Sequence, residues 1–475
     1  MYKLLLCWRY LRTRYLALAC IISVMLGVAT LIVVNSVMSG FSTKLKDRLH
    51  GLLSDIVIEA STMEGFADPG EKMARIRALP FLSERIEAMT PVMEVFAIMQ
   101  FSWPNGERVT RTVHLVGVDP KSRNLVGGFK EHLVQARSKP GEFSFELSPE
   151  ARKRYEYREA IMDLQQRAIT PVDPEQPPPP ARTPKRIKVP CGVVLGNLIA
   201  SYREKAGTDE NGTVKYVEKY PLGTDRSEVI ITTIGGERLM PVYDNFVVVD
   251  YFKSDMSEYD SQYVFVPLEH LQQLRTMQNR VTSIQIKLRD YATAPAVVKE
   301  LRKMFGKDGV RVETWEHKQG PLLAAISIEK GILNILLFLI IGVAGFGILA
   351  IFTMIVAEKT RDIGILKALG ASNGGVMKIF LGYGFLLGII GAWMGTALGL
   401  SLTFNINAIE HLLSNITGGE IFNREVYYFD KIPTNIEIWM LVLVNIGAIG
   451  IAVVFSVLPA MRAAMLHPVR ALRYE

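Results

Sequence analysis

The side chains that could bind a metal or act as nucleophiles are spread along the chain without a recognisable spacing. The seven histidines show no metal-ligand spacing, and the three cysteines cannot form a disulfide framework because two of them lie in or beside an apolar stretch. The carboxylates lie in segments that resemble solvated helices and turns, and a nucleotide-binding loop of the form GxxxxGK followed by Ser or Thr does not occur. We therefore expect no enzymatic site, no metal and no cofactor on this chain, so ATP-driven work would require a separate ATPase. The histidines are His50, His114, His132, His270, His317, His411 and His467, and the cysteines are Cys7, Cys20 and Cys191.

The composition indicates membrane helices joined to a large water-facing part. Of the 475 residues, 49% are hydrophobic and only 21% are charged, which is more apolar than most soluble proteins and less apolar than most multi-span transporters. Lysine and arginine exceed aspartate and glutamate by 54 to 47, and this net charge of +7 is too small and too dispersed to indicate binding to nucleic acid. The length allows roughly three domains of about 150 residues.

Four apolar runs lack Asp, Glu, Lys and Arg and are long enough to cross a membrane. A hydrocarbon core of about 30 Å requires about 20 apolar residues, and a buried helix of a soluble protein rarely runs so long without a polar face. The first run follows a basic leader but is longer than the roughly 7–15 residues of a signal-peptide core, so we expect an uncleaved helix. The four predicted transmembrane helices are Leu16–Met38, Gly331–Ala357, Ile379–Leu400 and Ile438–Leu458.

The basic residues of the short loops predict the orientation of these helices. Residues 1–15 carry four basic residues and no acidic one, and residues 358–378 and 459–475 are also basic. Because loops rich in lysine and arginine stay in the cytoplasm, both termini and the 358–378 loop are expected there. Residues 39–328 and 405–437 would then lie outside the cytoplasm. The fold class predicted is an α-helical membrane protein with a large extracytoplasmic domain between its first and second transmembrane helices.

Strand-like and helix-like segments alternate in residues 39–328, which predicts a mixed α+β domain of two lobes. An insert at about 135–190 interrupts it, because residues 149–170 form a highly charged helical pattern and residues 171–190 hold eight prolines. Consecutive prolines favour an extended polyproline II rod, so we interpret this part as a linker or exposed arm, with a partner-docking motif as the alternative. The expected strands are Ser54–Ala60, Val92–Phe101, Thr110–Val118, Glu228–Ile234, Phe246–Asp250, Tyr263–Val266 and Val281–Leu288, and the expected helices are Pro69–Leu79, Leu268–Met277 and Ala294–Phe305.

Two further patterns concern helix contacts. The segment Glu358–Ser372 is amphipathic and ends near Gly370, which predicts a short helix at the cytoplasmic surface between the second and third transmembrane helices. Such a helix could seat in a cleft of a separate ATPase, or it could simply join two membrane helices.

Glycines recur every four residues in the third transmembrane helix, which indicates either a flat packing face or the ordinary glycine enrichment of membrane helices. These glycines are Gly391, Gly395 and Gly399.

Several segments resemble the permeases of the FtsX/MacB-like ABC transporter superfamily and, within it, the lipoprotein-releasing (Lol) permease subunits. The run from the second transmembrane helix through Ser372 is specific for the superfamily, whereas the EYD sequence around Tyr259 and the segment that begins at Thr314 are typical of the Lol group. The resemblance covers nearly the whole chain except about 135–190, where the insert departs from the family's shorter domain. The similar segments are Asn35–Phe41, Phe252–Leu274, Thr314–Lys330, Ile332–Ser372 and Leu458–Glu475.

This resemblance implies a permease of the inner membrane that does not pass its substrate through a pore. A cytoplasmic ABC ATPase holding ATP and Mg²⁺ would drive it, and a second permease subunit, identical or different, would complete a dimer. Lipoproteins would be lifted from the membrane and handed to a periplasmic carrier, which needs energy because a buried acyl chain is stabilised by about 0.8 kcal/mol per CH₂. The residues of the implied ATPase-coupling helix are Glu358, Lys359, Arg361, Asp362, Ile363, Leu366 and Lys367.

We expect the acyl chains of the cargo at the outer-leaflet ends of the first two transmembrane helices. Branched side chains and an adaptable methionine would form an apolar wall there, although the same residues could face bulk lipid or pack within the bundle. Two other functions stay open: a MacB-type efflux permease for peptides or small toxins, and an FtsX-like signalling scaffold that regulates a cell-wall hydrolase. The residues expected at the acyl-chain cavity are Val33, Val37, Met38, Phe41, Ile332 and Leu336.

Overall fold

The computed structural model describes residues 15–62, 64–103, 105–169, 189–208, 214–236, 239–306, 308–417 and 431–467. The predicted basic leader, most of the proline-rich run, the middle of the 405–437 loop and the end of the C-terminal tail lie outside these ranges. The chain divides into two compact units, which we describe one at a time. The helical unit comprises Met1–Lys46, Pro321–Phe422 and Phe429–Glu475, and the sheet unit consists mainly of Asp47–Gly320.

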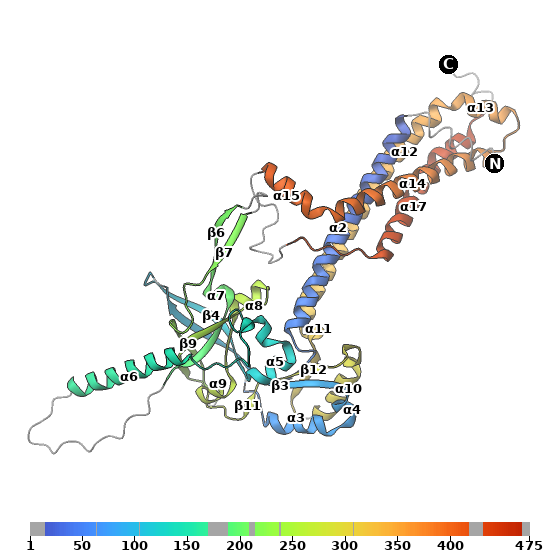
Figure 1. Ribbon diagram of the computed structural model, residues 1–475. Helices are drawn as coiled ribbons and strands as arrows, with labels where there is room; N and C mark the ends of the chain where they lie inside the picture. Colours follow the sequence, from blue (N-terminus) through green and yellow to red (C-terminus); the bar gives the residue numbers. More distant parts are fainter. Residues whose placement is uncertain are drawn as a thin grey trace, which may run out of the picture. The chain divides into compact units, whose positions relative to one another are not determined.

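Within the described residues, four helices are long and apolar enough to cross a membrane. At a rise of about 1.5 Å per residue, the 38 residues of α2 and the 39 residues of α12 extend well beyond a hydrocarbon core of about 30 Å. The predicted boundaries at Met38 and Gly331 therefore mark where the apolar sequence ends, while the helices themselves continue. The long helices are α2 (Tyr15–Leu52), α12 (Gly320–Glu358), α14 (Asn373–Phe404) and α17 (Ile438–Met465), and α13 (Thr360–Ala368) and α15 (Ile406–Thr417) are short (Figure 1).

The glycines of α14 lie where neighbouring helices approach most closely. A Cβ added to Gly391, Gly395 or Gly399 would lie only 2.7–3.0 Å from a side chain of α2. Two earlier glycines, Gly384 and Gly388, face α17 in the same way, with side-chain atoms 2.5 Å and 3.0 Å from the added Cβ. The glycines thus let α14 approach two helices of its own chain. The α2 side chains that face them are Val24, Val28 and Ile32.

A nine-stranded sheet, in the order β13-β1-β12-β3-β4-β10-β5-β9-β8, forms the centre of the sheet unit. β3 is long enough to pair on one side with β12 along its first half and with β8 along its second half. The second pairing closes six strands, in the order β3-β4-β10-β5-β9-β8, into a ring. Strands β12, β1 and β13 extend from this ring. The strands are β1 (Ile56–Ala60), β3 (Ile86–Ser102), β4 (Arg108–Val118), β5 (Cys191–Gly196), β8 (Glu228–Ile234), β9 (Pro241–Phe252), β10 (Tyr263–Pro267), β12 (Ser283–Leu288) and β13 (Val310–Thr314). Two small sheets pair β2 (Phe66–Ala67) with β11 (Arg280–Val281), and β6 (Tyr202–Thr208) with β7 (Val214–Lys219).

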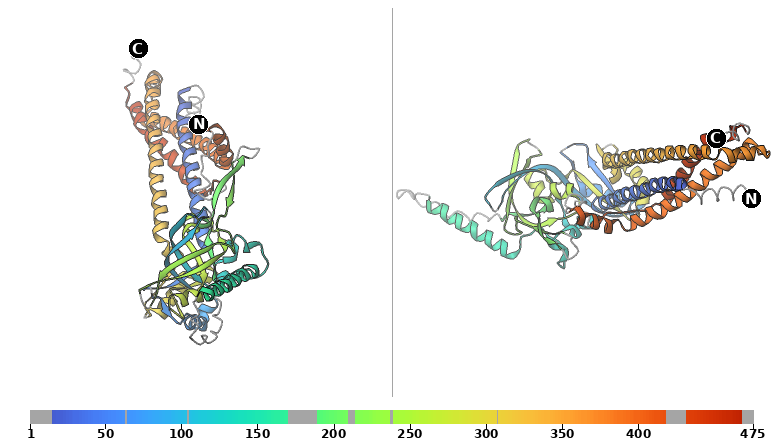
Figure 2. Two further views of the ribbon diagram at one scale, coloured as in Figure 1. Left: turned by 90° about the vertical axis from the view of Figure 1, so that its left-hand side faces the viewer. Right: turned by 90° about the horizontal axis from the view of Figure 1, so that it is seen from above.

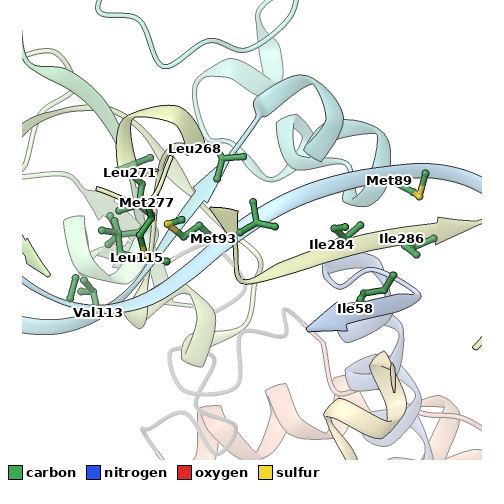
Figure 3. Packing of buried hydrophobic residues seen from close by; sticks show 14 of the residues in the cluster. Ile58, Met89, Met93, Val113, Leu115, Leu268, Leu271, Met277, Ile284 and Ile286 are labelled. Atoms are coloured by element: carbon green, nitrogen blue, oxygen red, sulfur yellow. The ribbon is translucent and has the colours of Figure 1, made fainter. Parts of the chain in front are cut away.

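Short helices flank this sheet, and a single hydrophobic core joins five of them to it. In β12, Ile284 and Ile286 are fully buried and point to the same side as Ile58 of β1, as the two-residue period of a strand requires (Figure 3). Leu268 and Leu271 of α9 lie near Leu115 of β4 in the same cluster. The helices are α3 (Pro69–Ala78), α4 (Pro80–Ser83), α5 (Pro120–Gly127), α7 (Asn197–Ala200), α8 (Ser257–Gln262), α9 (Leu268–Leu274), α10 (Ala294–Phe305) and α11 (Trp315–Lys318).

The charged segment of the insert forms helix α6 (Pro149–Ile169), which projects away from the sheet (Figure 2). Its first turns are anchored, because Ala151 and Tyr155 are buried and Arg158 pairs with Glu228 of β8 at 2.5 Å. The expectation of two lobes is wrong, since residues 47–320 form one compact unit around one large sheet. The ring of strands provides the physical reason, because it joins the earlier and later strands of the domain in one core.

Candidate functional site

The turn between α12 and α13 is fixed by short-range polar contacts. Lys359 stands just before α13, and its Nζ lies 2.5 Å from Asp362 Oδ2 in the first turn of that helix. The hydroxyl of Thr360 donates to the backbone oxygens of Val356 and Ala357 at 3.1 Å and 2.8 Å. These bonds satisfy carbonyls at the end of α12 and set the direction in which α13 leaves it.

The end of α13 is a Schellman motif, as the glycine in the sequence predicts. Gly370 has a φ of +96°, a left-handed conformation that glycine adopts without strain. Its N–H donates to Lys367 O at 3.1 Å, and the N–H of Ala371 donates to Leu366 O at 3.0 Å. The Ser372 hydroxyl then accepts from Gly375 N and caps α14. Both ends of α13 are therefore held in a defined geometry.

The two sides of α13 differ sharply in exposure. Ile363 is 2% exposed and belongs to the core of the helical unit, whereas Ile365 is 44% and Leu369 is 81% exposed. The exposed residues recur at the four-residue spacing of one helix face, which begins at Arg361. We call Arg361, Ile365 and Leu369 the open face of α13. Sequence reasoning selected Ile363 as a coupling residue, placed Leu369 on the apolar side of the helix without selecting it, and missed Ile365, although the 361–365–369 spacing was available. Of the other predicted coupling residues, Glu358 is exposed, and Lys359, Asp362, Leu366 and Lys367 are partly buried.

Lys367 connects α13 to the end of α17. Its ammonium donates to the backbone oxygens of Ala464 at 2.7 Å and Leu466 at 2.6 Å. Unpaired carbonyls and the negative end of the helix dipole make the C-terminus of a helix a favourable place for a cation. Lys367 was predicted as an ATPase-coupling residue, and in the structure its ammonium makes these two bonds within the chain. A displacement of α13 would therefore pull on α17.

The residues expected at an acyl-chain cavity lie on the surfaces of two helices. Val33, Val37, Met38 and Phe41 of α2 are partly buried. On α12, Ile332 is 53% and Leu336 is 50% exposed, and they begin a longer exposed apolar stripe along that helix. The other members of this stripe are Ile335, Leu339, Val343 and Phe346.

In the sheet unit, three side chains tie the end of α2 to the segment that leads into α12. His50, in the last turn of α2, has its Nε2 2.7 Å from Asp55 Oδ1 and stacks on the Trp315 ring at a centroid distance of 5.4 Å. The backbone N–H of Trp315 donates to Asp55 O at 3.2 Å, beside the antiparallel pairing of β1 with β13. We call His50, Asp55 and Trp315 the joint. Sequence reasoning did not single out His50 or Asp55, and only Trp315 lay in a segment used for the family resemblance.

Asp55 is the centre of this joint. Its side chain is fully buried, and its second oxygen accepts from the backbone N–H of Leu288 at 2.7 Å. Lys287 of β12 places its Nζ 3.3 Å from the same carboxylate. A buried carboxylate is tolerated only when hydrogen bonds and opposite charge compensate it, and here both are present. The joint therefore connects α2, β12 and β13 through one compensated charge.

The Asp of the EYD sequence is also buried. Asp260 Oδ1 accepts from the N–H and the hydroxyl of Ser254 at 2.8 Å and 2.7 Å, while its Oδ2 has no hydrogen-bond partner among the described residues. Burial raises the pKa of Asp260 to about 6. Its neighbour Tyr259 accepts a hydrogen bond from Gln319 at 3.1 Å, close to the start of α12. The EYD sequence thus contacts the segment between the joint and the start of α12.

Comparisons with known proteins relate this chain to membrane permeases. Residues 334–468 match the family model described as FtsX-like permease C-terminal. The chain is 26% identical to the lipoprotein-releasing system transmembrane protein LolC of Xylella fastidiosa, over 98% of this chain and 97% of that protein. LolE of Haemophilus influenzae is 28% identical over 45% of this chain and 51% of its own length. A macrolide export ATP-binding/permease protein MacB of Bdellovibrio bacteriovorus is 26% identical over 42% of this chain and 29% of its own length.

A solved structure of the periplasmic region of MacB from Actinobacillus actinomycetemcomitans is 14% identical, covers 59% of this chain and 97% of its own, and gives a TM-score of 0.25. A score this low carries no argument about the fold. Residues 334–468 are thus similar to an FtsX-like permease domain, and the Lol homologues together with the four apolar helices indicate a multi-pass protein of the inner membrane. The predicted resemblance is confirmed: the Lol permeases are homologous to this chain over its full length, and MacB is a more distant relative.

Proposed function

We propose that this chain is the permease subunit of an ATP-driven transporter that lifts acylated lipoproteins out of the inner membrane and passes them to a periplasmic carrier. Homology to LolC over nearly the full length supports this substrate class. The open face of α13 carries the proposal, because it presents exposed apolar side chains on a helix that is fixed at both ends. Exposed apolar residues at a water-facing loop indicate a protein partner.

That partner would be a cytoplasmic ABC ATPase that binds ATP and Mg²⁺. Ile365 and Leu369 would enter a cleft of the ATPase, and Arg361 at the edge of the open face would add charge complementarity. Ile363, Leu366 and Lys367 would hold α13 on the bundle, and Glu358, Lys359 and Asp362 would set its angle. The proposal places the loop 358–378 and both termini in the cytoplasm, as the charge bias predicts.

Motion would reach the other end of the chain through continuous helices. α2 runs from Tyr15 to Leu52 and α12 from Gly320 to Glu358 without a break. Because each helix is linked to the sheet unit at the joint, a shift in the helices would be transmitted to the sheet through Asp55 and Trp315. This arrangement moves a domain and needs no pore, which is consistent with membrane spans that lack ionisable residues.

The acyl chains would lie against α2 and α12 near Val33, Val37 and Ile332. The exposed stripe of α12 would be covered partly by these chains and partly by the second permease subunit, identical or different, that the Lol relatives imply. The glycines Gly391 and Gly395 would keep α14 seated on α2 while the exposed side of the bundle moves.

ATPase measurements on the reconstituted complex test this function. A triacylated lipoprotein should stimulate ATP hydrolysis and leave the membrane for a soluble carrier, whereas the same protein without its acyl chains should do neither. Stimulation by peptides or small toxins instead would favour efflux of the MacB kind, which the distant MacB match keeps as the second candidate. Hydrolysis that no substrate stimulates would contradict both transport functions.

A further inference from the structure

The helical unit contains a polar cavity of about 210 Å³ that the predicted acyl-chain residues do not line. Its walls come from α2, α12, the first turns of α17 and the segment that leads into α17. Five apolar residues, including Ile32 and Met440, form one part of the lining, and polar side chains form the rest. The polar side chains used below are Asn35, Ser39, Lys330, Asn334, Asn435 and Glu437.

One wall of the cavity is built by a close approach between α2 and residues 433–437. A Cβ on Gly40 would lie 2.5 Å from Pro433 O, so only glycine allows this contact. The N–H of Asn435 donates to Ser36 O at 2.8 Å, and the hydroxyl of Ser39 donates to the Glu437 carboxylate. This explains the Asn35–Phe41 sequence, whose polar and small residues form a preorganised wall.

Unused hydrogen-bond donors face the cavity from α12. Neither the Lys330 ammonium nor the Asn334 amide has a hydrogen bond or ion pair with another described residue. Their spacing of four places them on the same side of α12. The Glu437 carboxylate, in contrast, is already bound by Ser39. One wall of the cavity therefore carries two side-chain donors that have no hydrogen-bond partner among the described residues.

The position of these residues in the sequence fixes the depth of the cavity. Ser39 follows the first apolar run, Lys330 precedes the second, and Glu437 precedes the fourth. Three boundaries between apolar and polar sequence thus meet at one site. In a bilayer such boundaries lie at the edge of the hydrocarbon core, where the ester and amide carbonyls of acylated molecules are found.

We propose that this cavity binds the ester- and amide-linked polar head of an acylated substrate, with Lys330 and Asn334 donating to its carbonyl oxygens. This inference rests on the proposed function and adds a binding site for the part of the substrate that the acyl-chain wall does not recognise. The same chemistry occurs in a triacylated lipoprotein and in a phospholipid, and the experiment below separates these two sources.

The first measurement is the lipoprotein concentration that gives half-maximal ATPase stimulation of the complex in nanodiscs. Asn334→Leu and Lys330→Met should each raise it about 5- to 10-fold, the effect of one lost hydrogen bond, and Lys330→Arg should restore it. Asn445→Leu is the matched control, because Asn445 bonds to Thr396 at 2.9 Å within the bundle and does not line the cavity. Equal responses of wild type, Asn334→Leu and Lys330→Met would overturn the cavity assignment and leave the proposed function intact.

The second measurement identifies the ligand by a photo-crosslinker at position 334. A lipoprotein adduct that replaces a phospholipid adduct when lipoprotein is added supports the site for the cargo. A phospholipid adduct that lipoprotein does not displace assigns the site to lipid, and no acylated adduct at all overturns the proposal. If lipoprotein fails to stimulate even the wild-type complex, the proposed function fails, and the phospholipid arm still decides whether the cavity binds an acylated head.

Discussion

Replacing the two exposed apolar residues of α13 should release the ATPase while the chain stays folded. We expect the double variant Ile365→Ser, Leu369→Ser to show this, because these side chains are 44% and 81% exposed. Fully burying such a side chain is worth about 1.5–3 kcal/mol. Scaled by the exposed fractions, the pair would contribute about 2–4 kcal/mol to docking. Losing it should weaken ATPase binding roughly 30- to 700-fold.

Binding of purified ATPase to the permease in nanodiscs measures this effect directly. The matched control is Ile363→Val, which removes one methylene from the buried side of the same helix. It should lower stability by about 0.5–1.5 kcal/mol and leave the affinity for the ATPase within about twofold. The docking argument is refuted if the double variant binds the ATPase as tightly as wild type, or if Ile363→Val weakens binding equally.

Three other perturbations test the contacts that transmit motion and stabilise the sheet unit. Lys367→Met removes two charge-assisted hydrogen bonds to the end of α17, of about 1.5–3 kcal/mol each, so the complex should still bind its ATPase but should release lipoprotein more slowly per ATP hydrolysed. Asp55→Asn removes the charge that His50 and Lys287 compensate, and it should likewise lower release per ATP; an unchanged ratio would exclude a role for the joint. For Asp260, burial raises the pKa to about 6 from an ordinary 3.8, so the stability linked to its protonated form is complete below about pH 4 and is lost as the pH rises through 6. Asp260→Asn should therefore raise the free energy of unfolding more at pH 7.5 than at pH 4.5. The expected gain at pH 7.5 is on the order of 2–3 kcal/mol, and thermal unfolding at both pH values measures it.

The strands that the sequence predicts are those with a clear alternation or a β-branched run. β8 (Glu228–Ile234) has the predicted bounds, and β12 with β11 covers the predicted Val281–Leu288. β5 was missed because its sequence, CGVVLG, contains two glycines that are typical of a turn. The structure shows why they are there: a Cβ on Gly192 would lie 2.1 Å from Phe145 O, and one on Gly196 would lie 2.3 Å from Asp260 O. Such close approaches depend on residues distant in sequence, so a single sequence does not indicate them.

The position of the coupling helix was predictable, but its rotation about its own axis was not. Amphipathic spacing placed Ile363 on the apolar side of the helix, and the resemblance made it a coupling residue, whereas the structure buries it in the bundle, where the Lys359–Asp362 pair and the bonds of Lys367 to α17 hold the helix. The joint was not predictable for the same reason, because His50 and Trp315 meet only when β1 pairs with β13. Patterns within one segment define which residues are apolar, and contacts between segments define which of them are left exposed.

The polar cavity and the predicted acyl-chain wall belong to adjacent faces of one helix. The α2 residues that line the cavity, among them Ile32, Asn35 and Ser39, follow the three- and four-residue spacing of a single face. Val33 and Val37 recur at the same spacing one residue later, which places them about 100° further around the helix. A molecule whose polar head occupied the cavity would therefore have its acyl chains emerge beside these valines. The polar head and the chains would be recognised by separate surfaces, so removing the cavity's donors should weaken binding without removing the apolar wall.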